Sequence, residues 1–123
     1  KEIIPPASSQ GIIAIQSTTN KKTKLEMAVN KIFLSINDFN TYSEALAERS
    51  MLKTLDGTCR SPISSSAYII NDVDLFLYGA IAKPDGSKVI KSEIKGSKKD
   101  AILLGEQLGK ELIAKSIGEI IFD

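Results

Sequence analysis

Two turn signals divide the second half of the chain into three segments with the composition of β-strands. Residues 63–70 and 73–82 are largely apolar, and Asn71 and Asp72 between them tolerate positive φ, which favours a tight antiparallel hairpin. Pro84-Asp85-Gly86 predicts a second turn, because proline fixes the first central φ and glycine supplies the left-handed position. With a further strand expected over residues 89–95, the pattern predicts a three-stranded antiparallel meander.

Helical segments flank these three strands. Thr41-Tyr42-Ser43-Glu44 has the spacing of a capping box and predicts the start of a helix that Gly57 ends. A final helix is expected from Asp100 through Lys115, with Gly118 as its cap. The residues expected to face the core are Leu46, Leu52 and Leu55 on the first helix and Ala101, Leu104, Leu108, Leu112 and Ile113 on the second. The predicted fold class is therefore α+β, a three-stranded antiparallel sheet covered on one face by helices, in a domain over residues 37–123.

Residues 1–36 do not fit naturally into this domain. After a loop over residues 1–10, the β-branched run 12–15 predicts a strand buried on both faces. Thr23 and Glu26 have capping-box spacing, and the apolar stripe that follows predicts a helix ending near Asn37. We interpret residues 1–36 as a strand-helix remnant of a neighbouring α/β domain. The strand is then expected to be disordered or to pair with another chain, and the sequence, which begins with Lys, to be a piece of a longer protein.

The composition excludes several classes of function. Sixteen basic and fifteen acidic residues leave a net charge of +1, which gives no overall field to hold nucleic acid or an anionic membrane. The sequence contains no His and a single Cys, so Ser-His and Cys-His catalytic pairs and the common zinc sites are not expected. A lone Cys is typical of a reducing compartment, and the apolar runs are too short to span a bilayer. We therefore expect a cytoplasmic protein without a metal site.

The single cysteine, Cys59, is expected in a loop between a helix and a strand, where a ligand could reach its thiol. Most lone cysteines, however, are inert packing residues. The C-terminal end of the preceding helix disfavours a thiolate at this position, whereas Arg60 and Arg49 favour one. The residues alone leave both the role of Cys59 and the direction of its pKa shift open.

The surroundings of Cys59 resemble the signature of the porphobilinogen deaminase (hydroxymethylbilane synthase) family. In that family a helix with the sequence Ala-Glu-Arg precedes a loop with the sequence Leu-Glu-Gly-Gly-Cys-x-x-Pro-Ile, and the Cys follows the Arg by ten residues. Residues 47–49 and 55–63 of this chain match that pattern and spacing. Further similarities extend over nearly the whole chain, at residues 6–11 (family Pro-Ala-x-Gly-Gln-Gly), Ile15-Gln16 (family Ile-Glu), 84–86, 100–101 and 104–105.

Four positions depart from the family pattern. Ser9 and Thr58 stand where the family has Gly, Gln16 replaces a Glu, and Asp56 stands for Glu. The segment from Ser17 to Leu34 is also several residues longer than usual. None of these departures removes the thiol.

The resemblance implies that this chain is the C-terminal part of a transferase of tetrapyrrole and heme biosynthesis. Such an enzyme joins four porphobilinogen units into hydroxymethylbilane on a dipyrromethane cofactor, here bound through a thioether to Cys59. The resemblance also places Gln10 near the cofactor. The family's general acid/base Asp and the Arg residues that bind the substrate's carboxylates lie in the two preceding domains, so this piece alone should be inactive. The expected partners are porphobilinogen, linear tetrapyrrole intermediates and those missing domains, in a monomeric full-length protein.

Two alternatives belong to other classes. A free-standing α+β interaction module would use Cys59 only for packing. A redox sensor would require a thiol that reacts at neutral pH faster than free cysteine does.

Overall fold

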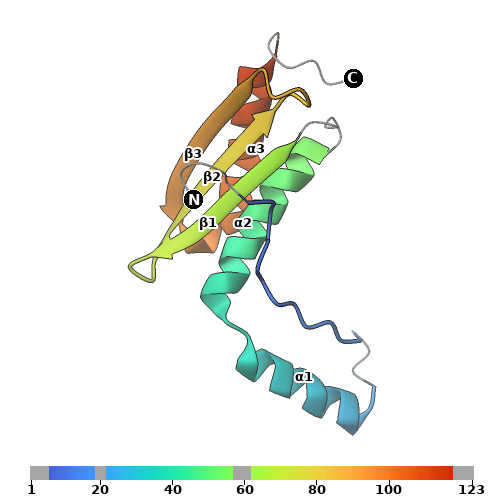
Figure 1. Ribbon diagram of the computed structural model, residues 1–123. Coiled ribbons are helices and arrows are strands. Elements are labelled where there is room, and N and C mark those ends of the chain that lie inside the picture. The colour runs from blue at the N-terminus through green and yellow to red at the C-terminus, as the bar shows by residue number, and fades with distance from the viewer. Residues whose placement is uncertain (1–5, 19–21, 57–61, 118–123) are drawn as a thin grey trace.

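The computed structural model describes residues 6–18, 22–56 and 62–117 of the 123-residue chain. Helices α1 (Lys24–Ile36) and α2 (Phe39–Asp56) come first, and strands β1 (Ile63–Ile70), β2 (Asp74–Ala82) and β3 (Val89–Ser97) follow. A 3-10 turn, η1 (Lys98–Asp100), leads into the final helix α3 (Ala101–Ser116). The three strands form one antiparallel sheet in the order β1-β2-β3, as the turn signals predicted (Figure 1).

Both turns of the meander adopt the backbone that their residues favour. Asn71 and Asp72 have φ values of 51° and 58°, and Gly86 has a φ of 71°. Asp85 accepts hydrogen bonds from the backbone N–H and the hydroxyl of Ser87, and these bonds lower the pKa of its carboxyl. Val73, which the sequence placed in the second strand, instead lies in the first turn and is 61% exposed.

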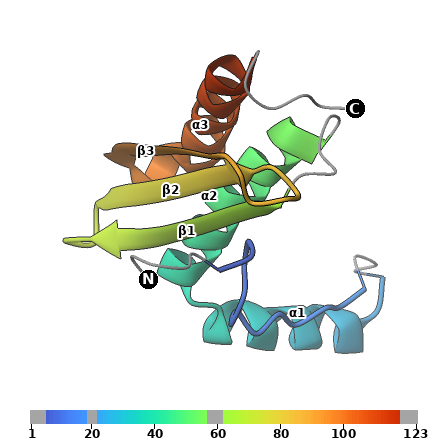
Figure 2. The ribbon, with the colours of Figure 1, turned by 45° about the horizontal axis from the view of Figure 1, so that its top comes forward.

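Helices α2 and α3 cover one face of the sheet, and no helix of the described residues covers the other face (Figure 2). The core between the two layers is apolar, and its fully buried members are Ala47, Met51 and Leu55 of α2, Leu75, Leu77 and Ile81 of β2, and Leu108 and Leu112 of α3. Burial of these side chains is the main stabilising contribution to such a domain. The predicted α+β fold class is confirmed.

The two helices of this layer cross at close range. Gly105 and Gly109, one turn apart on α3, face α2, where an added Cβ would meet the α2 backbone at Gly105 and the Thr54 side chain at Gly109. The hydroxyl of Ser50 on α2 donates to the carbonyl oxygen of Ile102 on α3 at 2.8 Å. Glycine therefore fixes the distance between the helices.

Capping explains where the first two helices begin. At α1 the capping box is formed as predicted, with Thr23 and Glu26 bonding each other's backbone N–H. Helix α2, however, begins at Phe39 instead of Thr41, because the Asp38 carboxylate accepts from the N–H groups of Asn40 and Thr41.

Helix α3 is attached to the outer strand by a polar cluster. Lys115 lies 2.6 Å from the Glu111 carboxylate, and Ser92 of β3 is hydrogen-bonded to both residues. The hydrogen bond from Lys115, followed by that from Ser92, lowers the pKa of Glu111.

The strand predicted at residues 12–15 is not formed. Residues 12–18 are neither helix nor strand, and Ile13 is 93% exposed, because the run has no neighbouring strand to share backbone hydrogen bonds. Helix α1 follows the predicted bounds, but it has no buried residue and lies away from the sheet (Figure 1). The division into 1–36 and 37–123 therefore stays a prediction.

Within the described part of the chain, no helix is long and apolar enough to cross a membrane. The same residues include no group of three or more Asp, Glu, His or Cys side chains arranged to hold a metal ion.

Candidate functional site

The predicted attachment loop joins two firmly held elements. Leu55, in the last turn of α2, is fully buried, and on the far side of the loop the Pro62 carbonyl accepts from the N–H of Ala82 at 2.9 Å. Cys59 itself, with the rest of residues 57–61, lies outside the described residues, as does the predicted cap Gly118. One end of the loop is thus anchored in the core and the other is held by a backbone hydrogen bond to β2.

Two glutamates of α2 bind the outer edge of β1. Glu44 and Glu48 are four residues apart and so lie on one side of the helix. The Glu48 carboxylate accepts from the N–H of Ala67 at 2.7 Å, and that of Glu44 accepts from the N–H of Ile69 at 2.9 Å. β1 is an edge strand, and these bonds occupy N–H groups that another strand could otherwise pair with.

The turn formed by residues 6–11 occupies the next position along the same edge. The Pro6 carbonyl accepts from the N–H of Ser65 at 3.1 Å, and the hydroxyls of Ser8 and Ser65 lie 2.6 Å apart. The N–H of Ser9 donates to the second oxygen of the Glu48 carboxylate at 2.5 Å. Glu48 therefore joins the turn, helix α2 and strand β1.

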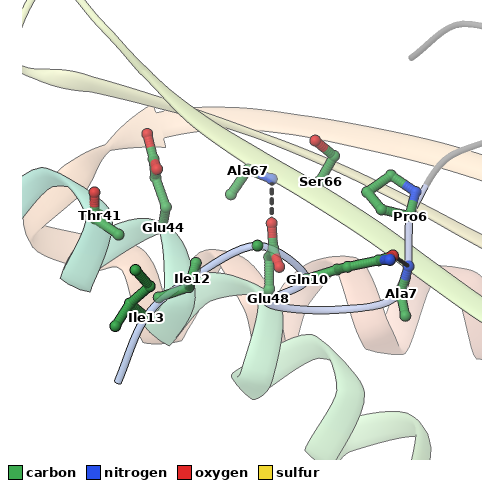
Figure 3. Close-up of a pocket in the computed structure, with 11 residues that line it drawn as sticks. Pro6, Ala7, Gln10, Ile12, Ile13, Thr41, Glu44, Glu48, Ser66 and Ala67 are labelled. Carbon is green, nitrogen blue, oxygen red and sulfur yellow. Dashed lines mark hydrogen bonds between the residues drawn. The ribbon is translucent and has the colours of Figure 1, made fainter. Parts of the chain in front are cut away.

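A hollow of about 520 Å³ opens between the turn, α2 and β1, as Figure 3 shows. Gln10, the second predicted site residue, lies at this hollow, and its side-chain oxygen accepts from the N–H of Ala7 at 3.3 Å. The polar side chains of Thr41, Glu44 and Glu48 also line the hollow. The hollow thus combines an exposed amide with two carboxylates.

Gln10 and the start of the loop that contains Cys59 lie at different positions along α2. Glu48, at the hollow, precedes the end of α2 at Asp56 by eight residues, which corresponds to about 12 Å along the helix. Gln10 is thus near the middle of α2, whereas the loop of Cys59 begins at its end.

The sequence pattern predicted only a capping role for Glu44 and no contact of Glu48 with the sheet. The structure instead shows both carboxylates accepting N–H groups of the sheet edge. Two acids at the i, i+4 spacing on the sheet-facing side of a helix are the sequence signal that could have indicated this arrangement.

Ser9 has a strained backbone in this turn. Its φ is 60°, in the left-handed region that is unfavourable for a residue with a Cβ. Its hydroxyl is also buried without a hydrogen-bond partner. Ser9 stands where the resembling family has glycine, a residue without either problem.

We expect Ser9→Gly to stabilise the domain by about 1 kcal/mol. The substitution removes the left-handed penalty and the unsatisfied hydroxyl, and these gains exceed the added backbone entropy of the unfolded chain. Urea denaturation of the wild type and the variant measures the difference. A matched Ser87→Gly variant, in an exposed turn, should show no stabilisation, and equal or lower stability of Ser9→Gly would contradict the expectation.

Comparison with known proteins agrees with this arrangement. Residues 42–114 match the family model described as porphobilinogen deaminase, C-terminal domain. Porphobilinogen deaminase of Campylobacter lari is 37% identical over 116 residues, which cover 94% of this chain and 35% of that protein. Porphobilinogen deaminase of Campylobacter jejuni is 32% identical over 121 residues, covering 98% of this chain and 37% of that protein.

The chain spans about a third of the length of these curated relatives. The match to the family model includes most of helix α2, the whole sheet and nearly all of α3. The chain therefore belongs to the porphobilinogen deaminase family, of which it contains the C-terminal domain.

Proposed function

We propose that this chain is the C-terminal part of a transferase that joins four porphobilinogen units into hydroxymethylbilane. The observation that carries the proposal is the family match over residues 42–114, which contains the loop with the only thiol of the chain. The α+β domain that presents this loop supports the proposal, since both ends of the loop are held by buried or hydrogen-bonded residues.

In this proposal Cys59 attaches the dipyrromethane cofactor. A thioether requires a thiol, and sulfur is a soft nucleophile suited to an electrophilic methylene carbon. The bound dipyrromethane would supply the pyrrole end to which porphobilinogen units are added. The protein's task at this position is to hold the sulfur, and the residues on either side of the loop, Leu55 and Pro62, are themselves held by burial and by a hydrogen bond.

Gln10 is proposed to contribute to cofactor binding. Its amide can both donate and accept hydrogen bonds, and the side chain is exposed at the hollow beside Glu48. The hollow lies near the middle of α2, and Gln10 would contact the part of the bound cofactor or growing chain that reaches this position.

Residues 1–36 are proposed to belong to a neighbouring domain. Helix α1 has no buried residue and exposes Leu25, Leu34 and Ile36, each by 60% or more. Apolar surface of this kind is normally covered in a folded protein. The relatives are almost three times as long as this chain, so the remaining length is available to cover it.

The proposal also includes partners and compartment. The residues for acid-base chemistry and carboxylate binding would come from the missing domains of the same polypeptide, acting on porphobilinogen and linear tetrapyrrole intermediates. The full-length protein would be a monomer in the cytoplasm, where a free thiol stays reduced.

One comparison, between this chain and the full-length protein, tests the proposed function. The full-length protein should release ammonia from porphobilinogen and form a linear tetrapyrrole, and this chain alone should do neither. Hydrogen exchange of the α1 amides should be fast in this chain and slow in the full-length protein, because the missing part covers the helix.

An inactive full-length protein would contradict the transferase assignment. Turnover by this chain alone would contradict the proposed location of the catalytic groups, and equally fast α1 exchange in both proteins would contradict the domain division.

A further inference from the structure

Glu48 is a charged residue that is almost completely buried, with 7% of its surface exposed. Its two carboxylate oxygens accept N–H groups from segments that are far apart in sequence, Ser9 at 2.5 Å and Ala67 at 2.7 Å. An ionised carboxylate offers two acceptor oxygens and no donor, so it is the side chain best suited to join two N–H groups. Glu48 therefore connects the turn to the C-terminal domain.

The contacts of this turn stop where the chain leaves the domain. Pro6, Ser8 and Ser9 are all hydrogen-bonded to β1 or α2. Beyond Gly11 the chain runs out toward α1, with Ile13 93% and Ile15 57% exposed (Figure 1). The position of the turn thus determines where residues 12–36 leave the C-terminal domain.

Glu44 provides a natural comparison within the same helix. It lies one turn earlier and accepts one N–H of the same edge strand, that of Ile69. This hydrogen bond is to the strand and not to the turn. Substituting each glutamate in turn therefore distinguishes the loss of a contact to the strand edge from the loss of the contact to the turn.

We propose that Glu48 is a positioning residue that locks residues 6–11 onto the domain carrying Cys59. The lock fixes Gln10 relative to helix α2 and sets the path by which the preceding domain is joined to this one. The effect on turnover rests on the proposed function, whereas the lock itself does not. A misplacement of about 1 Å can reduce the rate of an enzyme roughly 100-fold, so such a residue affects the reaction without touching substrate.

Glu48→Gln in the full-length protein tests the proposal. The amide retains the shape but replaces one acceptor oxygen with a donor, which opposes one of the two N–H groups. We expect hydrogen exchange at residues 9–11 to rise about 10-fold or more, equivalent to at least about 1.4 kcal/mol of lost protection. The intact mass should still include the cofactor, while kcat should fall roughly 10-fold with little change in KM.

Two control variants accompany this measurement. Glu44→Gln should leave exchange at residues 9–11 at the wild-type rate, because it changes only the contact to Ile69. Glu106→Gln, on the exposed side of α3, should leave both exchange and kcat unchanged. If Glu48→Gln does not fold, Glu48→Asp, which keeps the charge on a side chain one methylene shorter, is measured in the same way.

A covalent link can restore the lock independently. The hydroxyls of Ser8 and Ser65 are 2.6 Å apart, so cysteines at these positions are close enough for a disulfide. In the Glu48→Gln background, oxidation of this Cys pair by diamide should restore both slow exchange at residues 9–11 and kcat, and dithiothreitol should reverse the effect. Peptide mass identifies the bond.

Wild-type exchange at residues 9–11 in Glu48→Gln, or equal acceleration in Glu44→Gln, would overturn the lock. Failure of the oxidised disulfide to restore kcat while exchange recovers would overturn the positioning role. An inactive wild-type protein would instead count against the proposed function, and the exchange comparison would still decide the lock.

Discussion

Full-length protein with Cys59→Ala should lack the added mass of two pyrrole units that we expect on the wild type. Alanine has no nucleophilic atom, so no thioether can form at this position. Formation of tetrapyrrole should fall to the background without enzyme, because the chain under assembly has no attachment point. Intact-mass spectrometry measures the first effect and product absorbance measures the second.

Thr58→Ala is the matched control in the same loop, since it changes a neighbouring side chain and keeps the thiol. It should retain the added mass. The role proposed for Cys59 fails if the wild type carries no added mass, or if Cys59→Ala still carries it. Equal urea denaturation of both variants would show that the loss of the cofactor does not result from unfolding.

The sheet was predictable from sequence because local chemistry specifies it. Asn71 and Asp72 adopt the positive φ values that a two-residue hairpin needs, and Gly86 does so at the second turn. The bounds of β1, 63–70, agree with prediction at both ends. Hydrophobic periodicity similarly placed the buried residues of α3 correctly, including Leu104, Leu108 and Leu112.

The face of α2 was less predictable because it depends on what the helix packs against. Leu46, Leu52 and Leu55 were expected to face the core, yet only Leu55 is fully buried, together with Ala47 and Met51. A small residue such as Ala47 can lie at the centre of this interface because Gly105 of α3 passes directly over it. Counting large apolar residues cannot detect a contact made by two small ones.

The hollow was even less predictable from the sequence, because residues far apart in the chain form it. Gln10 was singled out by family resemblance, whereas the partners of Glu48 at Ser9 and Ala67 are separated from it by 39 and 19 residues. No local pattern specifies that a helical carboxylate will bind the edge of a strand. The left-handed Ser9 shows the same limit, because serine gives no signal of positive φ.

Gly105→Ala should destabilise the domain by about 3 kcal/mol or more. In an open helix the substitution would be favourable by about 1 kcal/mol, since alanine has the higher helix propensity. Here an added Cβ would lie 2.3 Å from the Ala47 carbonyl oxygen and 2.8 Å from the Met51 backbone nitrogen, so two helix backbones would have to move apart. Such movement would also loosen the core around Met51 and Leu108. Urea denaturation measures the loss.

Gly109→Ala provides a graded comparison that stays informative if Gly105→Ala does not fold. Its added Cβ would meet the side chain of Thr54 at 2.7 Å, while the nearest backbone atom, the Met51 carbonyl oxygen, is at 3.2 Å. A side chain yields more readily than a backbone, so the loss should be about 1–2 kcal/mol. Gln107→Ala, on the exposed side of α3, should change stability by less than about 0.5 kcal/mol. A rearrangement of side chains alone cannot accommodate a Cβ against a carbonyl oxygen. If Gly105→Ala were as stable as the wild type, α2 and α3 could therefore not cross as closely as this fold requires.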